Sequence, residues 1–269
     1  HPNTWTLTVP DVDAAALVHG STYGVSVQST DTAGNVTSEN SLYSLRINTA
    51  RPDVPTIHVL KTNDTTPELT GTAEPGVEIE VSVGGVTFTT TADDNGDWSI
   101  DLATAIPTGA SAAAPALADG SYTPVITATD PAGNTGPAAS LPLTIDTTAP
   151  AAPAAVLASG SDSGTLGDDT TNDTTPTIQG TGEPGATITI KDAAGNVIAT
   201  ALVDGSGNWA ATPTTALPEG TNALSITATD PAGNTSPATP LTLTIDSVAV
   251  AQPAAPDLTD DSDLGVSST

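Results

Sequence analysis

Hydrophobic and polar residues alternate with a period of two through most of the chain. The segments 186–193, 223–230 and 241–246, for example, place Ile, Leu or Ala at alternate positions, with Thr, Ser or Lys between them. Such alternation is typical of strands that bury one face. Thr, Val and Ile dominate these segments, Gly, Pro, Asn and Asp separate them, and about seven of them occur per unit, as in an antiparallel β-sandwich. The sequence therefore predicts an all-β fold.

The chain repeats itself at a spacing close to 100 residues. The string ITATDPAGNT occurs at 126–135 and again at 226–235, and a weaker copy, VQSTDTAGNV, occurs at 27–36. The strings NDTTP, EPG and LTID recur around it in the same order. A repeat of this length fits whole domains in tandem and is too long for a solenoid repeat.

The repeats predict where the domains begin and end. Residues 1–50 correspond to the C-terminal half of a sandwich domain, 51–146 and 147–246 to two complete domains, and 247–269 to a linker and the start of the next repeat. We expect an extended rod, because the linker IDTTAP is short and its proline restricts the backbone. The sequence looks like a slice of a longer array.

Composition excludes several classes of function. Four Lys and Arg against 31 Asp and Glu give a formal net charge of −27 at pH 7. Such a chain repels phosphate backbones and anionic lipid surfaces, so we expect neither a nucleic-acid partner nor membrane insertion. The absence of cysteine removes disulfides, thiol nucleophiles and zinc–thiolate sites. We also expect a monomer.

The motifs TDPAGN, NDTTP, EPG and IDTTAP, taken in that recurring arrangement, resemble the bacterial Ig-like repeats of giant type I-secreted (RTX) adhesins. The resemblance covers essentially the whole chain. It implies tandem Ig-like β-sandwich domains in a rigid stalk that is secreted to the bacterial cell surface and folded there by calcium. It also implies neighbouring repeats of the same chain as partners, with a host glycan or receptor bound through a distal domain.

Acidic residues gather where one domain is expected to follow the next. In a seven-stranded sandwich the turns after the second, fourth and sixth strands lie at the end where the chain enters. This brings Asp146 of the linker toward Glu183, Asp230 and Asn234. Gathered carboxylates repel one another unless a cation lies between them, and Ca²⁺ prefers such oxygen ligands.

The first complete domain carries a corresponding set. Its members are Asp53 of the linker, Glu74, Asp130 and Asn134, together with Asn48 where the later units have Asp. Because Asn carries no charge, we expect this junction to bind calcium less tightly.

A further acidic cluster lies in the first loop of the second complete domain. It comprises Asp162, Asp168, Asp169, Asn172 and Asp173, and the start of the next repeat carries Asp257, Asp260, Asp261 and Asp263. For all these acids a second interpretation stays open. Asp and Asn favour turns because their side chains bond to nearby backbone, and this needs no metal.

Other notable residues are interpreted as structural. Trp5, Trp98 and Trp209 recur at one strand position, which favours core packing over a sugar-binding platform. Tyr23 and Tyr122 resemble a tyrosine corner, and Asn222 stands there in the second domain. Glu78 and Glu80 are expected on a solvated strand face, because the next unit does not repeat them. The three histidines are scattered, so we expect no enzyme.

Three hypotheses of function follow. The leading one is a calcium-stiffened stalk segment of a large cell-surface adhesin. The alternative is an Ig-like module that itself binds a glycan or host receptor, for which the insertion 103–122 is the candidate, although we expect this insertion to pack against its own domain. The third, an accessory domain of a carbohydrate-active enzyme, requires a catalytic domain outside this sequence.

Overall fold

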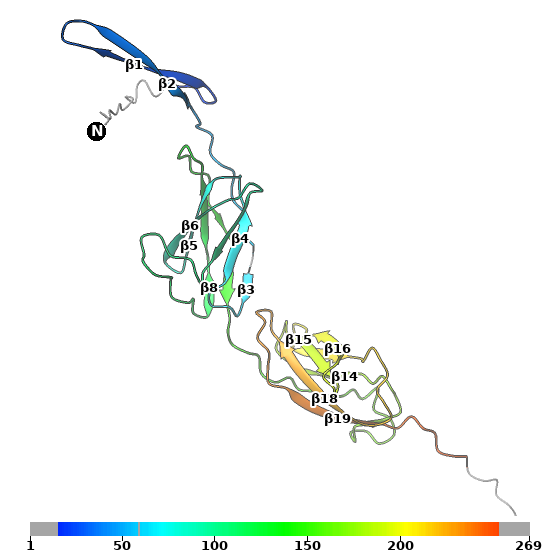
Figure 1. The fold of residues 1–269 in the computed structure, drawn as a ribbon. Helices are drawn as coiled ribbons and strands as arrows, with labels where there is room; N and C mark the ends of the chain where they lie inside the picture. The colour runs from blue at the N-terminus through cyan, green and yellow to red at the C-terminus, as the bar shows by residue number, and fades with distance from the viewer. Residues whose placement is uncertain (1–15, 59, 253–269) are drawn as a thin grey trace, which may run out of the picture. The chain divides into compact units, whose positions relative to one another are not determined.

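The computed structural model describes residues 16–58 and 60–252, and every regular element in them is a β-strand (Figure 1). The chain divides into two compact units, His1–Thr148 and Ala149–Thr269, and each has its own hydrophobic core. No helix in the described part is long and apolar enough to cross a membrane. The predicted Trp5 and the acids from Asp257 to Asp263 lie outside the described residues.

The first unit begins with a two-stranded antiparallel hairpin. Strands β1 (Thr22–Thr30) and β2 (Val36–Arg46) pair from Thr22 with Arg46 to Thr30 with Val36. Leu45 of β2 is 41 % exposed, whereas the corresponding Leu243 of the second unit is fully buried. The hairpin therefore keeps the alternation of a sandwich strand pair without a second described sheet covering its apolar face. That residues 1–50 are half a domain remains a prediction.

A β-sandwich completes the first unit. Its strands are β3 (Leu60–Thr62), β4 (Glu68–Thr72), β5 (Glu78–Val83), β6 (Val86–Thr91), β7 (Asp97–Asp101), β8 (Gly120–Tyr122), β9 (Val125–Thr129), β10 (Ala139–Ser140) and β11 (Leu143–Ile145). They form the sheets β10-β9-β5-β6, β3-β11-β8 and β4-β7. All neighbours are antiparallel except β3 and β11, which run parallel.

The first core lies between these sheets. Alternate residues of β5 and β9, such as Ile79, Val81 and Ile126, are fully buried beside Phe88 and Trp98. Glu78 and Glu80, on the other face of β5, are exposed as expected. The alternation seen in the sequence thus separates core from surface as predicted.

The second unit is a sandwich of the same topology. Its strands are β12 (Val156–Leu157), β13 (Thr170–Thr171), β14 (Ile178–Thr181), β15 (Thr187–Lys191), β16 (Val197–Leu202), β17 (Asn208–Ala211), β18 (Gly220–Thr229) and β19 (Thr239–Ile245). A three-stranded sheet, β12-β14-β17, packs against a five-stranded one, β13-β19-β18-β15-β16. The first strand is divided, because β12 pairs with β14 whereas β13 runs parallel to β19.

Tryptophan and glycine face each other across corresponding strand pairs. Trp98 and Trp209 are 3 % and 4 % exposed, which confirms that they pack in the core. Gly71 is opposite Trp98, and Gly180 is opposite Trp209. A Cβ on either glycine would meet a backbone carbonyl, that of Thr56 or Ala154, at 2.0 Å or less. Glycine is needed there because another backbone approaches closely.

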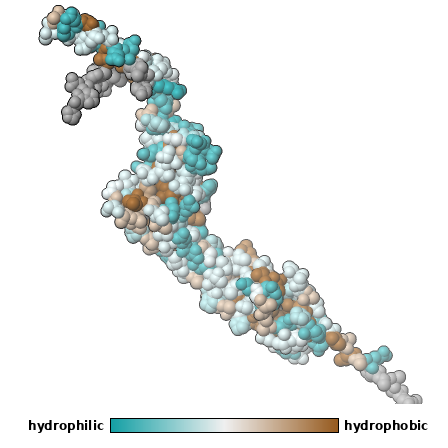
Figure 2. Space-filling model, viewed as in Figure 1, coloured by the Kyte–Doolittle hydropathy of each residue, from teal (hydrophilic) through white to brown (hydrophobic). Residues whose placement is uncertain are grey.

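The fold class is confirmed: the chain is all-β and contains tandem Ig-like sandwiches. The insertion 103–122 forms a loop against its own domain, with Ala105, Ala114 and Leu117 on the core and the Leu117 N–H donating to Thr65 O at 2.8 Å. Figure 2 shows a largely hydrophilic to neutral surface on the visible face, with scattered brown apolar patches.

Candidate functional site

The favoured ligand candidates Asp130 and Asp230 close five-residue turns. In the second domain Oδ1 of Asp230 accepts the N–H groups of Ala232 and Asn234 at 2.8 and 2.9 Å, and Oδ2 accepts Asn234 Nδ2 at 2.8 Å. Asp130 makes the same set of bonds with Ala132 and Asn134. Both carboxylates are thus bound by local N–H donors.

The same turn occurs between other strands of both units. Asp31 and Asp192 make the full set of bonds with the Asn four residues later, and Asp93 and Asp204 make the two backbone bonds. The Asp192 turn joins β15 to β16, so it is not one of the turns expected where the chain enters. The geometry of Asp130 and Asp230 is therefore that of a general turn and does not by itself indicate a metal.

These hydrogen bonds lower the pKa of five of the turn carboxyls, those of Asp31, Asp93, Asp130, Asp192 and Asp230. For Asp130 and Asp192 the largest cause is the Asn side chain that donates to the carboxylate. For Asp230 burial is the largest single influence and raises the pKa, but the combined N–H donors outweigh it, so its pKa is also below the ordinary value. Each of these five turns is consequently built around an ionised carboxylate.

Where the chain enters the first sandwich, the predicted residues meet in pairs. Asn48 Nδ2 donates to Asp130 Oδ2 at 2.7 Å, and Asn134 Nδ2 donates to Asn48 O at 3.0 Å. The Asp53 N–H donates to Glu74 Oε1 at 2.8 Å. Asn48 thus supplies a hydrogen-bond donor to Asp130 at a position where Asp would add a second negative charge.

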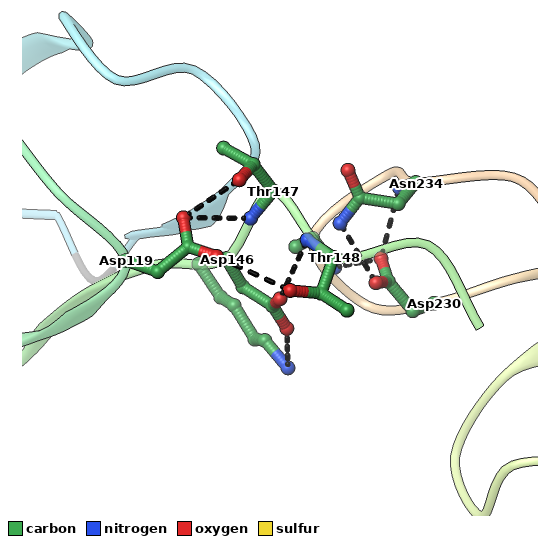
Figure 3. A network of polar contacts seen from close by, with 8 residues as sticks. Asp119, Asp146, Thr147, Thr148, Asp230 and Asn234 are labelled. Atoms are coloured by element: carbon green, nitrogen blue, oxygen red, sulfur yellow. Dashed lines mark hydrogen bonds and ion pairs between the residues drawn. The ribbon is translucent and has the colours of Figure 1, made fainter.

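At the other end of the first sandwich, Asp146 faces a cation that the sequence interpretation did not assign to it (Figure 3). Its Oδ2 lies 3.3 Å from Lys61 Nζ, and its Oδ1 accepts the Thr148 N–H at 3.2 Å. Both partners are partly exposed, so the pair contributes modestly to stability. Glu183, in the turn after β14, is exposed, and its carbonyl accepts the Ala186 N–H at 3.1 Å.

The first loop of the second sandwich holds the other predicted acids. Asp173 accepts from the Thr175 N–H at 2.9 Å and Asp168 from the Thr170 N–H at 2.9 Å. Asp169 has a left-handed backbone with φ of 57°, which is uncommon for a residue with a side chain. Asp162 Oδ2 accepts from the Gly167 N–H.

Asp162 differs from the other acids in its second oxygen. Its Oδ1 is buried and has no hydrogen-bond partner in the described part of the chain. A buried carboxylate oxygen without a donor is costly and is a typical cation ligand. Across residues 16–58 and 60–252, however, no three His, Cys, Asp or Glu side chains lie close enough together to hold a metal ion. Any ion here must also use backbone or hydroxyl oxygens.

The sequence interpretation missed one repeated contact. His19, Asp119 and Glu219, spaced 100 residues apart, each accept the backbone N–H of a linker residue just beyond the last strand of the domain. The sequence does carry a signal for this contact: each of the three residues is followed by Gly, and each linker partner is Thr or Ser. Only the strand register, however, shows which residues meet.

Two sandwiches of one topology, joined in tandem and repeating the same turns, define a class of protein built from Ig-like repeat domains. Residues 60–147 and 148–247 both match the bacterial Ig-like domain family, and the chain belongs to that family. A search of curated proteins found no match.

Solved structures with a similar fold include bacterial adhesins. A 1.5-MDa bacterial ice-binding adhesin is 21 % identical, with 90 % of this chain and 79 % of that one covered and a TM-score of 0.31. A Ca²⁺-stabilized adhesin of an Antarctic bacterium that binds ice is 24 % identical, with coverages of 84 % and 57 % and a TM-score of 0.30. A biofilm-associated protein domain is 22 % identical, with coverages of 72 % and 30 % and a TM-score of 0.28.

Proposed function

We propose that the chain is a stalk segment of a large secreted adhesin on the bacterial cell surface, stiffened by calcium. The observation that carries this proposal is the repetition of one complete Ig-like domain, with the same turns and the same linker contact, at a spacing of 100 residues. Tandem repetition with short linkers makes a long stalk. The partners of each domain are its neighbouring repeats in the same chain. We propose an extended monomeric rod that holds a distal glycan- or receptor-binding domain away from the cell.

The proposed route to the surface is type I secretion, as in the giant non-fimbrial adhesin of Salmonella, which the motifs resemble. A chain without cysteine needs no oxidant after export, and a charge of −27 keeps the unfolded chain soluble. We assign the chain no enzymatic role.

The first loop of the second sandwich is the calcium site that the geometry favours. Asp162 Oδ1 supplies a buried oxygen without a donor, and Asp168, Asp169 and Asp173 add negative charge in the same loop. The ion would neutralise these carboxylates and hold the loop that precedes β13. Extracellular modules bind Ca²⁺ with dissociation constants of about 10⁻⁴–10⁻³ M, which suits the proposed location.

Asp146, Glu183, Asp230 and Asn234 remain a second proposed set of ligands. Asp230 and Asn234 are only 5 % and 8 % exposed, and their hydrogen bonds leave lone pairs on the carboxylate. The first set, Asp53, Glu74, Asp130 and Asn134, is the weaker candidate, because Asn48 already donates to Asp130.

The binding-module alternative gains no support from the insertion. Ala105, Ala114 and Leu117 pack against the core of their own domain, although Ile106 is exposed. Tyr122, the one aromatic residue of the insertion, donates its hydroxyl hydrogen to Ala118 O at 2.9 Å.

Calcium titration of thermal unfolding tests the proposal. At about 10 mM Ca²⁺ a site with a dissociation constant near 10⁻³ M adds about 1.4 kcal/mol, which corresponds to a rise of about 5–10 °C in the Tm of a domain of this size. Asp162→Asn should lose most of this rise. Asp192→Asn, which changes a turn Asp of the same domain, should keep it. An equal rise in Asp162→Asn and the unaltered chain would exclude the loop site, and no rise in any variant would exclude calcium stiffening.

A further inference from the structure

Asp119 and Glu219 contact the linkers in the same strand register, and His19 makes its contact from beside Gly20, whose N–H donates to Ile47 O at 2.8 Å. Gly120 pairs with Ile145, and Gly220 pairs with Ile245, the last residue of β19. The residue before each glycine therefore lies at the edge of the sheet, beside the point where the chain leaves the domain. Its side chain reaches the linker residue two positions after the isoleucine, which is Thr147 for Asp119, Ser247 for Glu219 and Thr49 for His19.

Asp119 makes the most complete version of the contact (Figure 3). Its Oδ1 accepts the Thr147 N–H at 3.1 Å and the Thr147 hydroxyl at 2.8 Å, and its Oδ2 accepts the Thr148 hydroxyl at 3.2 Å. Two successive linker residues are thus bound to one carboxylate. The Thr147 hydroxyl is also the leading cause that lowers the pKa of the Asp119 carboxyl.

Glu219 and His19 make the same contact with different chemistry. Glu219 Oε1 and Oε2 accept the Ser247 N–H at 3.1 and 3.3 Å, and Oε2 also accepts the Ser247 hydroxyl at 2.8 Å. His19 Nδ1 accepts the Thr49 N–H at 2.9 Å, which requires an unprotonated Nδ1. Asp, Glu and His occupy the same position, and all three accept a hydrogen bond from the linker. This indicates that the shared role is to accept hydrogen bonds and that it does not require a metal ligand.

We propose that Asp119, Glu219 and His19 are linker clamps: positioning residues that fix the direction in which the chain leaves each Ig-like domain before any ion binds. A free linker of a few residues samples many backbone conformations. Two or three hydrogen bonds to the domain edge remove the freedom of its first residues. The clamps act without calcium. Only their role in stiffening a stalk rests on the proposed function.

The clamps are tested in the full chain with excess EGTA. Because the chain has no cysteine, Thr89→Cys and Thr200→Cys introduce two specific spin-label sites on exposed strand positions of the two sandwiches. Pulsed EPR then measures the distribution of distances between the labels, and amide hydrogen exchange measures the protection of the Thr147 N–H.

Asp119→Ala should widen the distance distribution by about twofold and raise the exchange rate of the Thr147 N–H by about three- to tenfold. Asp119→Asn, which keeps an acceptor oxygen, should restore most of both. Asp93→Ala, which removes a turn Asp of the same domain, should leave the linker measurements unchanged.

An unchanged distribution in Asp119→Ala overturns the proposal, even with faster exchange, because the bonds would then be local only. An equal change in Asp93→Ala also overturns it, since the effect would come from the domain as a whole. The calcium proposal is judged separately, by adding Ca²⁺ to the unaltered chain. If the ion has no effect there while Asp119→Ala still widens the distribution, calcium stiffening fails and the clamp stands.

Discussion

The two complete sandwiches share a topology but differ in the continuity of their main sheet. In the second, β18 and β19 run unbroken through a five-stranded sheet. In the first, the same two strands are each cut, into β8 and β9 and into β10 and β11, so that the sheet is divided in two. Pro124 and Pro142 stand at the cuts, where the second domain has Leu224 and Thr242. Proline has no N–H to donate to a ladder, so single residues decide the continuity of the sheet.

The two domains also use different residues to make the same hydrogen bond from a side chain to an upstream backbone carbonyl. Tyr122 OH donates to Ala118 O at 2.9 Å, and Asn222 Nδ2 donates to Pro218 O at 2.8 Å, four residues upstream in both cases. The prediction of a tyrosine corner is confirmed for Tyr122. In the second domain Asn222 makes the equivalent bond from a shorter side chain.

The largest expected effect tests whether the two domains are independent. Trp98→Ala and Trp209→Ala should each lower the free energy of unfolding of their own domain by about 3–5 kcal/mol, because each leaves a cavity in a closed core. Differential scanning calorimetry should show one transition shifted and the other unchanged. A shift of both transitions by one substitution would show that the domains unfold as one unit.

The next largest effect comes from placing a proline in the second domain at the position where Pro124 interrupts the sheet of the first. Leu224→Pro should destabilise the second domain by about 1–3 kcal/mol more than Leu224→Ala does, because proline also removes a backbone donor from β18. Urea unfolding of the two variants gives this difference directly. Equal losses would mean that the prolines of the first domain do not cause its divided sheet.

A smaller effect compares the two corner residues. Tyr122→Phe removes one hydrogen bond and should cost about 0.5–1.5 kcal/mol. Asn222→Ala should cost more than Tyr122→Phe, since Asn222 also donates to Gly220 O and is only 8 % exposed. Chemical denaturation of each variant measures both costs. A cost for Asn222→Ala well below that of Tyr122→Phe would contradict the equivalence of the two side chains.

The smallest expected effect is on thermal stability at low pH. Asp130 and Asp230 have folded-state pKa values below the ordinary value of 3.8. Their stabilisation is therefore fully present above that value and is lost as the pH falls through the lowered folded-state pKa. The Tm should decline as the pH falls from 5 to 2, and less steeply in Asp130→Asn and Asp230→Asn. A Tm that rises in acid would contradict the ionised turns.

Sequence patterns predicted the structural features that depend on residues close together in the chain. Alternation identified Ile188 and Ile190 as core residues, the single Trp of each domain was placed in the core, and the Ala-rich insertion was expected to pack against its own domain. These features follow from neighbouring residues and the repeat. The turn interpretation of Asp130 and Asp230 was also present in the sequence, since DAAGN at 192–196 carries the same pattern away from the linkers.

Contacts between distant strands could not be predicted in the same way. Lys61 meets Asp146 because β3 runs parallel to β11, with Lys61 opposite Thr144. Asp119 meets Thr147 because of the register of β8 on β11, and the unpartnered Oδ1 of Asp162 depends on the path of one irregular loop. Such contacts are set by three-dimensional register, which residue spacing alone does not specify.

The most direct test of the calcium-stiffened stalk is small-angle scattering of the unaltered chain in millimolar Ca²⁺ and in excess EGTA. The proposal predicts a greater maximum dimension, and less flexible scattering, with calcium than with the chelator, reversibly. Identical scattering in the two conditions, at a calcium concentration that saturates any binding seen by calorimetry, would contradict it.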